Sequence, residues 1–146
     1  MLKLGQADFT CGRSKYRDFL TETPEPTSKV FVKISLEKDL ASSFWAQVDT
    51  GAAWSVLDPL VAKRFGYWEL DGERLGLDTR LGLKWGTLVR IPIRFLADDG
   101  EHFDTDGTFF ICPDWPPGRT FLGYSGLLDS MRFALDPHAN HFYFGS

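Results

Sequence analysis

The chain has 146 residues, of which 43% are hydrophobic and 15% aromatic, a composition that suits one domain with a filled core and excludes a disordered or fibrous protein. The formal net charge is −4 and no run of Lys or Arg alternates with aromatic residues, so we expect no nucleic-acid partner. No apolar run reaches the roughly 18 residues of a membrane span and the chain does not begin like a signal peptide, so we expect a soluble, cytoplasmic protein with no membrane partner.

The first part of the chain divides into a polar segment and the start of a sheet. Residues 1–28 are mixed and polar and end in a proline-containing stretch, so they are interpreted as an N-terminal arm or linker. Apolar and polar residues then alternate over 30–37, which predicts a strand with one buried face. A second apolar strand over 43–50 leads directly to Asp49.

A short helix is predicted next. Asp58 suits its N-cap, Pro59 its first position and Gly66 its left-handed end. A glycine-punctuated loop or hairpin over 70–86 follows and feeds a long strand that ends near residue 96. Because Pro92 lacks an N–H, we expect it at an edge, at a bulge, or where that N–H would face away from a partner strand.

The last third of the chain continues the β pattern. Asp99–Gly100 predicts a hairpin turn, residues 107–112 an apolar strand, and residues 115–118 a rigid turn. Apolar residues within 127–131 suggest a short amphipathic helix, and residues 141–145 a last strand. The sum predicts an all-β single domain, a closed or folded-over sheet with one or two short helices.

Two cysteines and three histidines give no pattern of a metal or redox site. Cys11 and Cys112 are far apart and form no Cys-x-x-Cys motif, so two separate reduced thiols are expected. His102, His138 and His141 are too scattered for a ligand set. We therefore expect no metal and no cofactor.

Asp49 stands in the stretch FWAQVDTGAAWSVLDP, between two apolar runs. An aspartate at the end of a buried strand is costly unless several donors satisfy its oxygens, so it is either a turn-former or a chemical group. Asp, Thr and Gly are good turn residues by themselves. The apolar residues on both sides place this Asp in a hydrophobic frame, which favours the chemical role.

These residues resemble the retropepsin-like aspartic proteases, the single-domain relatives of retroviral proteases. The motif of that family is an apolar pair, then Asp-Thr/Ser-Gly-Ala, then an apolar run, and residues 46–57 (AQVDTGAAWSVL) resemble it. A second element, an apolar pair and Gly before a helix with apolar residues, is matched by Phe121–Gly123 and the residues after it. The resemblance covers about 29–146 and implies a closed β-barrel-like lobe with a flap hairpin, which residues 81–88 match loosely.

The resemblance implies that Asp49 is catalytic. The chemistry needs two carboxylates that share one proton, so that one activates water and the other polarises the scissile carbonyl. The chain has one such motif, because Asp104–Gly107 contains an extra Asp and lacks an apolar frame. A functional pair must therefore come from a homodimer with Asp49 of each chain at the two-fold axis.

Neighbouring residues receive supporting roles from the resemblance. Thr50 would hydrogen-bond across the two-fold axis to the partner's motif. Gly51 would let backbone donors approach the carboxylate closely, and Ala52 would border the substrate cleft.

Four further residues are candidates for contact with substrate. Phe121 and Trp54 would line side-chain pockets, although both also suit a role as core aromatics. Gly82 and Gly86 would permit a lid that opens for a peptide and closes to exclude water, or they belong to an ordinary loop.

The leading hypothesis is thus a homodimeric aspartic endopeptidase that hydrolyses extended peptide segments. One alternative is a non-catalytic dimeric peptide-binding module on the same fold, since a fold does not guarantee activity. Another is a monomeric β domain in which Asp49 is a turn residue. Ala53 and Tyr124 stand where retroviral members carry an acid and an Arg, so we do not expect the ion pair that joins the subunits of those enzymes.

Overall fold

The structure is a computed structural model that describes residues 1–19, 27–36, 40–68 and 72–146. Its helical segments are η1 (Leu40–Ser42), α1 (Pro59–Arg64) and η2 (Leu128–Ser130). Its strands are β1 (Lys3–Leu4), β2 (Ala7–Asp8), β3 (Gly12–Lys15), β4 (Val30–Ser35), β5 (Phe44–Val48), β6 (Ser55–Val56), β7 (Glu73–Thr79), β8 (Gly82–Phe95), β9 (Asp99–Gly100), β10 (Phe103–Ile111), β11 (Thr120–Leu122), β12 (Arg132–Asp136) and β13 (His141–Gly145).

The largest sheet closes on itself. Its strand order is β10-β6-β11-β5-β4-β8-β7, and β10 also pairs with β8, so β10, β6, β11, β5, β4 and β8 form a ring. Buried aliphatic and aromatic side chains fill this ring, including Val32, Ile34, Ile91, Phe109 and Leu122. The prediction of an all-β domain with a closed, barrel-like sheet is confirmed.

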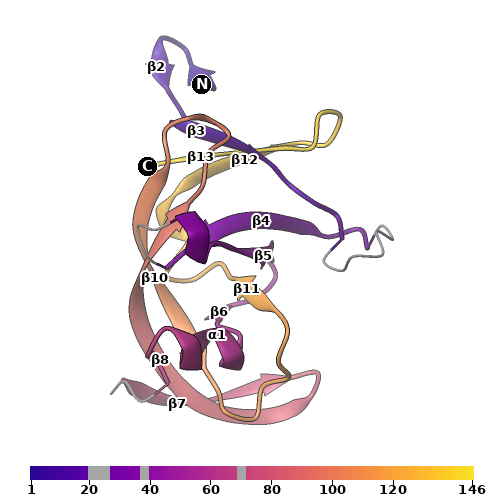
Figure 1. The fold of residues 1–146 in the computed structure, drawn as a ribbon, viewed down its shortest axis with the longest axis vertical. Coiled ribbons are helices and arrows are strands. Elements are labelled where there is room, and N and C mark those ends of the chain that lie inside the picture. The colour runs from indigo at the N-terminus through magenta and orange to yellow at the C-terminus, as the bar shows by residue number, and fades with distance from the viewer. Residues whose placement is uncertain (20–26, 37–39, 69–71) are drawn as a thin grey trace.

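The two longest strands extend beyond the ring. β8 and β10 pair antiparallel over nine residues each, from Phe103↔Phe95 to Ile111↔Thr87, and curve along one side of the molecule (Figure 1). The first half of β8 pairs instead with β7, so the predicted hairpin exists and turns at Arg80–Leu81. Residues 82–88 of β8 pair with β7, and residues 94–95 pair with β4. Pro92 lies between these two parts and, among the described residues, faces a partner strand on one side only, β10.

The N-terminal segment contains regular structure. β3 pairs with β13 on one side and with β9 on the other, in a four-stranded sheet of order β12-β13-β3-β9 at the end of the molecule opposite the β7–β8 hairpin (Figure 1). Residues 12–15 of the predicted N-terminal arm or linker thus belong to a sheet. The proline-containing stretch 20–26 lies outside the described residues, and the domain boundary at residue 28 stays a prediction.

Phenylalanine rings join the two sheets. Phe95 is fully buried at the end of β8, and its ring centroid lies 5.7 Å from that of Phe144 and 6.2 Å from those of Phe103 and Phe142. Such tilted and stacked pairs stabilise beyond the area that they bury. These four phenylalanines thus connect the barrel to the four-stranded sheet.

One predicted helix is confirmed and the other is shorter than expected. Asp58 caps α1 by accepting a hydrogen bond from Leu60 N at 3.1 Å, and Gly66 has φ +76° just after the helix. The segment expected to form an amphipathic helix over 127–131 forms only η2, a single 3-10 turn, and β12 begins directly after it.

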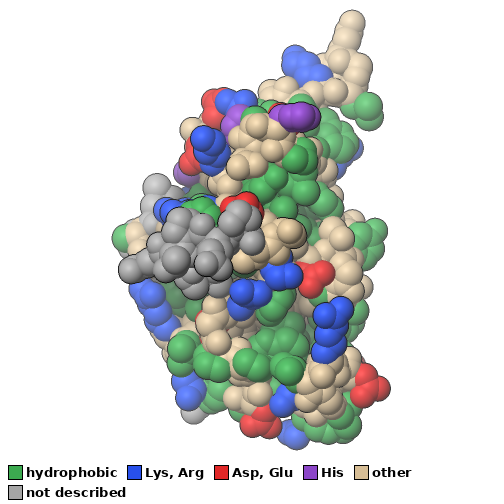
Figure 2. All heavy atoms as spheres, turned by 90° about the vertical axis from the view of Figure 1, so that its right-hand side faces the viewer, with side chains coloured by type: hydrophobic (Ala, Val, Ile, Leu, Met, Phe, Trp, Pro, Cys, Tyr) green, Lys and Arg blue, Asp and Glu red, His purple; other side chains and the backbone are tan. Residues whose placement is uncertain are grey.

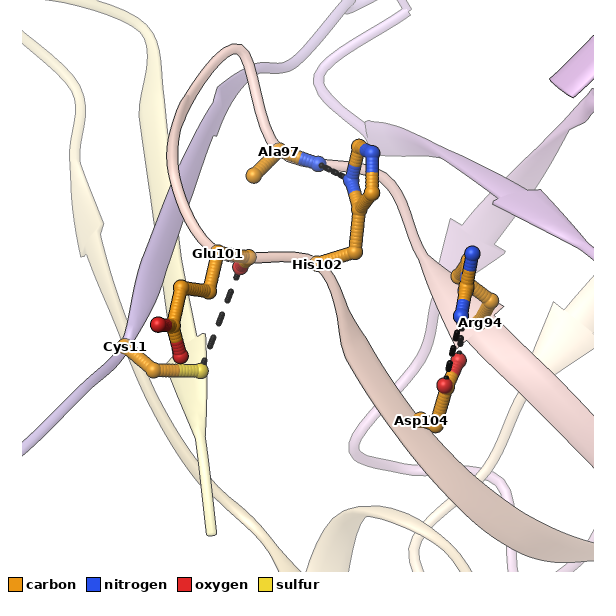
Figure 3. Close-up of polar contacts among 6 residues, drawn as sticks. All are labelled: Cys11, Arg94, Ala97, Glu101, His102 and Asp104. Atoms are coloured by element: carbon orange, nitrogen blue, oxygen red, sulfur yellow. Dashed lines mark hydrogen bonds and ion pairs between the residues drawn. The ribbon is translucent and has the colours of Figure 1, made fainter. Parts of the chain in front are cut away.

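The connection between β8 and β10 is tied to its surroundings by polar contacts (Figure 3). Ala97 N donates to His102 Nδ1 at 2.9 Å, and Arg94 forms a two-pronged ion pair with Asp104 at 2.6 and 2.7 Å. Asp99–Gly100, predicted as a hairpin turn, lies in the connection of the antiparallel pair β8–β10 and also forms the short strand β9 against β3. The turn residue Gly100 keeps the positive φ, +80°, that its type favours.

Both cysteines are free thiols, as expected. Cys11 approaches the carbonyl oxygen of Glu101 (Figure 3), and burial raises the pKa of its thiol. In the described part of the chain, no helix has the length and apolar character needed to cross a membrane.

We predict that Phe95→Ala lowers the free energy of unfolding by about 3–5 kcal/mol, because it removes a fully buried ring between the two sheets. Leu60→Ala, at a side chain that is 60% exposed on α1, is the control and costs under about 1 kcal/mol. Denaturant unfolding at one fixed protein concentration measures both. Equal losses for the two variants would contradict this description of the core.

Candidate functional site

Asp49 directly follows β5 and is held by the neighbouring strand. Its N–H donates to the carbonyl oxygen of Leu122, the last residue of β11, at 2.9 Å. β11 runs parallel to β5 and antiparallel to β6, and so lies between the strands that precede and follow the Asp49 loop. The backbone of Asp49 is thereby part of the sheet, while its side chain is half-buried.

The loop after Asp49 turns around its carboxylate. Gly51 N donates to Asp49 Oδ1 at 3.1 Å, and Ala52 N donates to the carbonyl oxygen of Asp49 at 3.2 Å. This hydrogen bond from the loop's own backbone fixes the orientation of the carboxylate. Gly51 thus has the position that the sequence predicted for it, beside the Asp49 side chain.

The loop after Asp49 is also hydrogen-bonded to the residues that follow β11. Tyr124 N donates to Ala52 O, and Ser125 N donates to Ala53 O, both at 2.8 Å. Gly123 passes so close to the loop that a Cβ there would lie 2.4 Å from the carbonyl carbon and oxygen of Trp54. The two sequence elements that suggested the family therefore meet in space and hold each other.

Two cavities meet at Asp49. Both are bordered by Asp49, Gly51, Ala52, Arg80 and Phe121. The first, of about 570 Å³, is completed by Lys29, Gln47 and Arg119, and we call it the basic cavity. The second, of about 440 Å³, is completed mainly by apolar side chains and is called the apolar cavity; its further lining is Ala53, Trp54, Val56, Leu77, Asp78, Thr79 and Trp115.

The predicted substrate-contact residues fall into two groups. Ala52, Trp54 and Phe121 border these cavities, so the structure brings them to Asp49. Gly82 and Gly86 border neither. Gly82 begins β8 with φ +94°, and a Cβ at Gly86 would lie 2.4 Å from Ile111 O, so the two glycines serve the turn and the close packing of β8 on β10. Their part in a lid stays a prediction.

The residue after Asp49, Thr50, is exposed to solvent in the single chain. Its predicted hydrogen bond to a partner's motif stays a prediction.

Asp104 and Asp106 lie away from Asp49, on β10. They border a separate cavity, and the carboxylate of Asp104 is engaged by Arg94 (Figure 3). The second Asp-containing stretch thus has a different environment from the Asp49 loop. No cluster of three or more His, Cys, Asp or Glu side chains suitable for a metal ion occurs among the residues that the structure describes.

Four residues of the basic cavity were not identified from the sequence: Lys29, Gln47, Arg80 and Arg119. For two of them the sequence held a signal. Gln47 precedes Asp49 by two residues and Arg119 precedes Phe121 by two, so each shares a strand face with a residue already assigned to the site. Lys29 and Arg80 have no such spacing to Asp49 or Phe121, and the three-dimensional fold places them here.

We predict that Gly123→Ala destabilises the protein by about 1–3 kcal/mol or more, because the added methyl group has no room beside the Trp54 backbone. Gly51→Ala is the matched control for stability, since its Cβ would meet only Asp49 Oδ1 at an ordinary 3.4 Å. Thermal and denaturant unfolding compare the two. A Gly123→Ala protein as stable as the Gly51→Ala protein would contradict the close approach described here.

Comparisons with known proteins support the fold. No family model and no curated protein matches the chain. Among solved structures, a retropepsin-like aspartic protease from Rickettsia conorii is similar over 90% of this chain and 98% of its own, with a TM-score of 0.56 and 14% identity. The EIAV protease, solved with the inhibitor HBY-793, matches over 76% of this chain and 94% of its own, with a TM-score of 0.42 and 23% identity. The chain has the retropepsin-like fold.

Proposed function

We propose that the protein is an aspartic endopeptidase that works as a homodimer. The observation that carries this proposal is the placement of Asp49, half-buried where two cavities meet and held by backbone hydrogen bonds to Leu122 and Gly51. A fixed, partly exposed carboxylate beside cavities of side-chain size is the arrangement that acid–base hydrolysis requires. The fold is compatible with this activity, and the likeness to proteases adds support by analogy.

In the proposed reaction, two Asp49 carboxylates share one proton. The ionised carboxylate takes a proton from water, whose oxygen bonds to the carbonyl carbon of the scissile peptide. The protonated carboxyl donates to the carbonyl oxygen, which becomes a hydroxyl of the tetrahedral intermediate. In the collapse of that intermediate, the ionised carboxylate takes the proton of one hydroxyl as the C=O bond re-forms. The protonated carboxyl gives its proton to the leaving nitrogen as the C–N bond breaks, so the pair again shares one proton.

A second copy of the chain supplies the second carboxylate in this proposal. Thr50, Gly51, Ala53 and Tyr124 surround Asp49 and are exposed, and Tyr124 is 51% exposed although it is a large aromatic residue. Their exposure leaves room for a partner to approach Asp49 closely. A two-fold axis at this position would bring the same residues of both chains together.

The β7–β8 hairpin would cover the bound peptide. Arg80 at its turn borders both cavities, and Leu77 on β7 borders the apolar cavity. A two-stranded hairpin that borders a cleft with its tip is suited to act as a lid, which admits an extended peptide and then excludes water.

We predict that Asp49→Asn abolishes peptide cleavage and leaves the melting temperature nearly unchanged, because the amide keeps the shape of the carboxylate and cannot act as a base. Cleavage of a mixed peptide library by the two proteins, with thermal melts, measures both effects. Asp129→Asn, at an exposed carboxylate in η2, is the control. Undiminished cleavage by Asp49→Asn would refute the catalytic role; a wild-type protein that binds peptides and cleaves none would favour the non-catalytic module.

We also predict a concentration-dependent activity, because dissociation of the dimer separates the two carboxylates. Sedimentation velocity over a dilution series gives the dimer dissociation constant, and specific activity falls over the same range. A strict monomer, or specific activity that stays constant far below that constant, would exclude a carboxylate pair shared between chains.

A further inference from the structure

The basic cavity carries an unusual excess of positive charge for a site built around a carboxylate. Lys29, Arg80 and Arg119 border it, and Asp49 is the one acidic residue in its lining. The ion pairs formed within the described residues use Lys3, Arg13 and Arg94, so the three cations of the cavity have no carboxylate partner there. Figure 2 shows Lys and Arg side chains around the middle of the face toward which the tip of the β7–β8 hairpin points.

Arg119 is held by two contacts within the described residues. It is half-buried just before β11, its Nη1 donates to Gln47 Oε1 at 3.2 Å, and its guanidinium carbon lies 5.3 Å from the centre of the Phe31 ring. Gln47 and Phe31 are themselves buried. A guanidinium has five N–H donors, so one bond to Gln47 leaves donors that are held in place for a ligand.

The sheet places Arg119 beside the reacting groups. Phe121 on β11 is in register with Gln47 on the parallel strand β5. Side chains two residues apart on a strand share a face, so Arg119 lies on the face of Phe121, and Asp49 on that of Gln47. Arg119 thus borders the same cavity as Asp49, and its hydrogen-bond partner Gln47 lies two residues before Asp49.

The two cavities that meet at Asp49 differ in chemistry. The apolar cavity is bordered by Trp54, Val56, Leu77 and Trp115, whereas Lys29 and Arg119 border the basic cavity alone. Each volume is large enough for a long side chain. A peptide that passes Asp49 would therefore meet cationic donors on one side and apolar surfaces on the other.

We propose that the basic cavity binds an acidic side chain of the substrate, through Arg119, next to the scissile bond. This inference rests on the proposed function. An Arg fork binds a carboxylate with two parallel hydrogen bonds, and the partly buried position of Arg119 strengthens the attraction relative to bulk water. The apolar cavity takes a bulky apolar side chain nearby, so the preferred substrates combine Glu or Asp with an aromatic or large aliphatic residue around the cleaved bond.

The test begins with a peptide library, digested by the wild-type protein and sequenced at the cleaved bonds. Matched peptide pairs that carry Glu or Gln at the enriched position then give kcat/KM. We expect the Glu peptide to be preferred by about tenfold or more, the range of a charge-assisted hydrogen bond. In Arg119→Gln this ratio falls to about two or less, and Arg119→Lys keeps an intermediate ratio because it retains the charge without the fork.

Arg64→Gln is the matched control, because Arg64 is exposed on α1 and borders neither cavity. It keeps the wild-type ratio. Melting curves show that each variant is folded before its ratio is measured. A ratio near one in the wild-type protein, or a ratio that Arg119→Gln leaves intact, overturns the proposal while cleavage itself remains.

A binding measurement separates this inference from the proposed function. Calorimetry with the Asp49→Asn protein compares Glu and Gln forms of one peptide, and again after Arg119→Gln. If the Glu form binds more tightly than the Gln form and this difference is lost in Arg119→Gln, the acidic site is supported. If the wild-type protein also cleaves no peptide, the proposed peptidase activity is refuted although the acidic site stands. Equal binding of the two forms overturns the acidic site.

Discussion

The insertion of β11 between β5 and β6 is the constraint on which the candidate site depends. It lets Asp49 N donate to Leu122 O, so the residue after β5 is held by the sheet although it belongs to a loop. The same insertion brings Gly123 against the Trp54 backbone, with Gly123 N donating to Ser55 Oγ at 2.9 Å. Breaking these hydrogen bonds would leave backbone N–H and C=O groups without partners, so the loop and β11 stay in place. The backbone of Asp49 is therefore positioned by strand order, and Gly51 N orients its carboxylate.

The sequence predicted the long elements and missed the short ones. β4 and α1 were predictable, because an alternating pattern and the Asp58–Pro59 cap are local signals. β6 and β11 have two and three residues, too few to display a period, and they exist because neighbouring strands pair with them. β3 was hidden for a related reason: the polar sequence Gly12–Lys15 becomes a strand through its pairing with β13 and β9, both distant in sequence.

Some residues of the candidate site could be recognised from their sequence neighbours, and others only from contacts with distant parts of the chain. Asp49 stood out because an acid between apolar runs is unusual in any fold. Arg119 did not, since the hydrogen bond that aims it joins residues 72 positions apart in sequence. Asp104 illustrates the opposite case: it lies in an Asp-Thr-Asp-Gly stretch, yet the structure pairs it with Arg94 on β8. Environment, more than the residue letters, distinguishes the two acids.

The most direct test of a carboxylate pair shared between two chains is a subunit-mixing experiment. Wild-type and Asp49→Asn proteins are refolded together at constant total concentration, well above the dimer dissociation constant, and the cleavage rate is measured as a function of the wild-type fraction. If each active site needs Asp49 from both chains, the rate follows the square of that fraction, and an equal mixture retains about a quarter of the activity. A rate proportional to the wild-type fraction, with about half of the activity in the equal mixture, would show that each chain acts alone and would contradict the account.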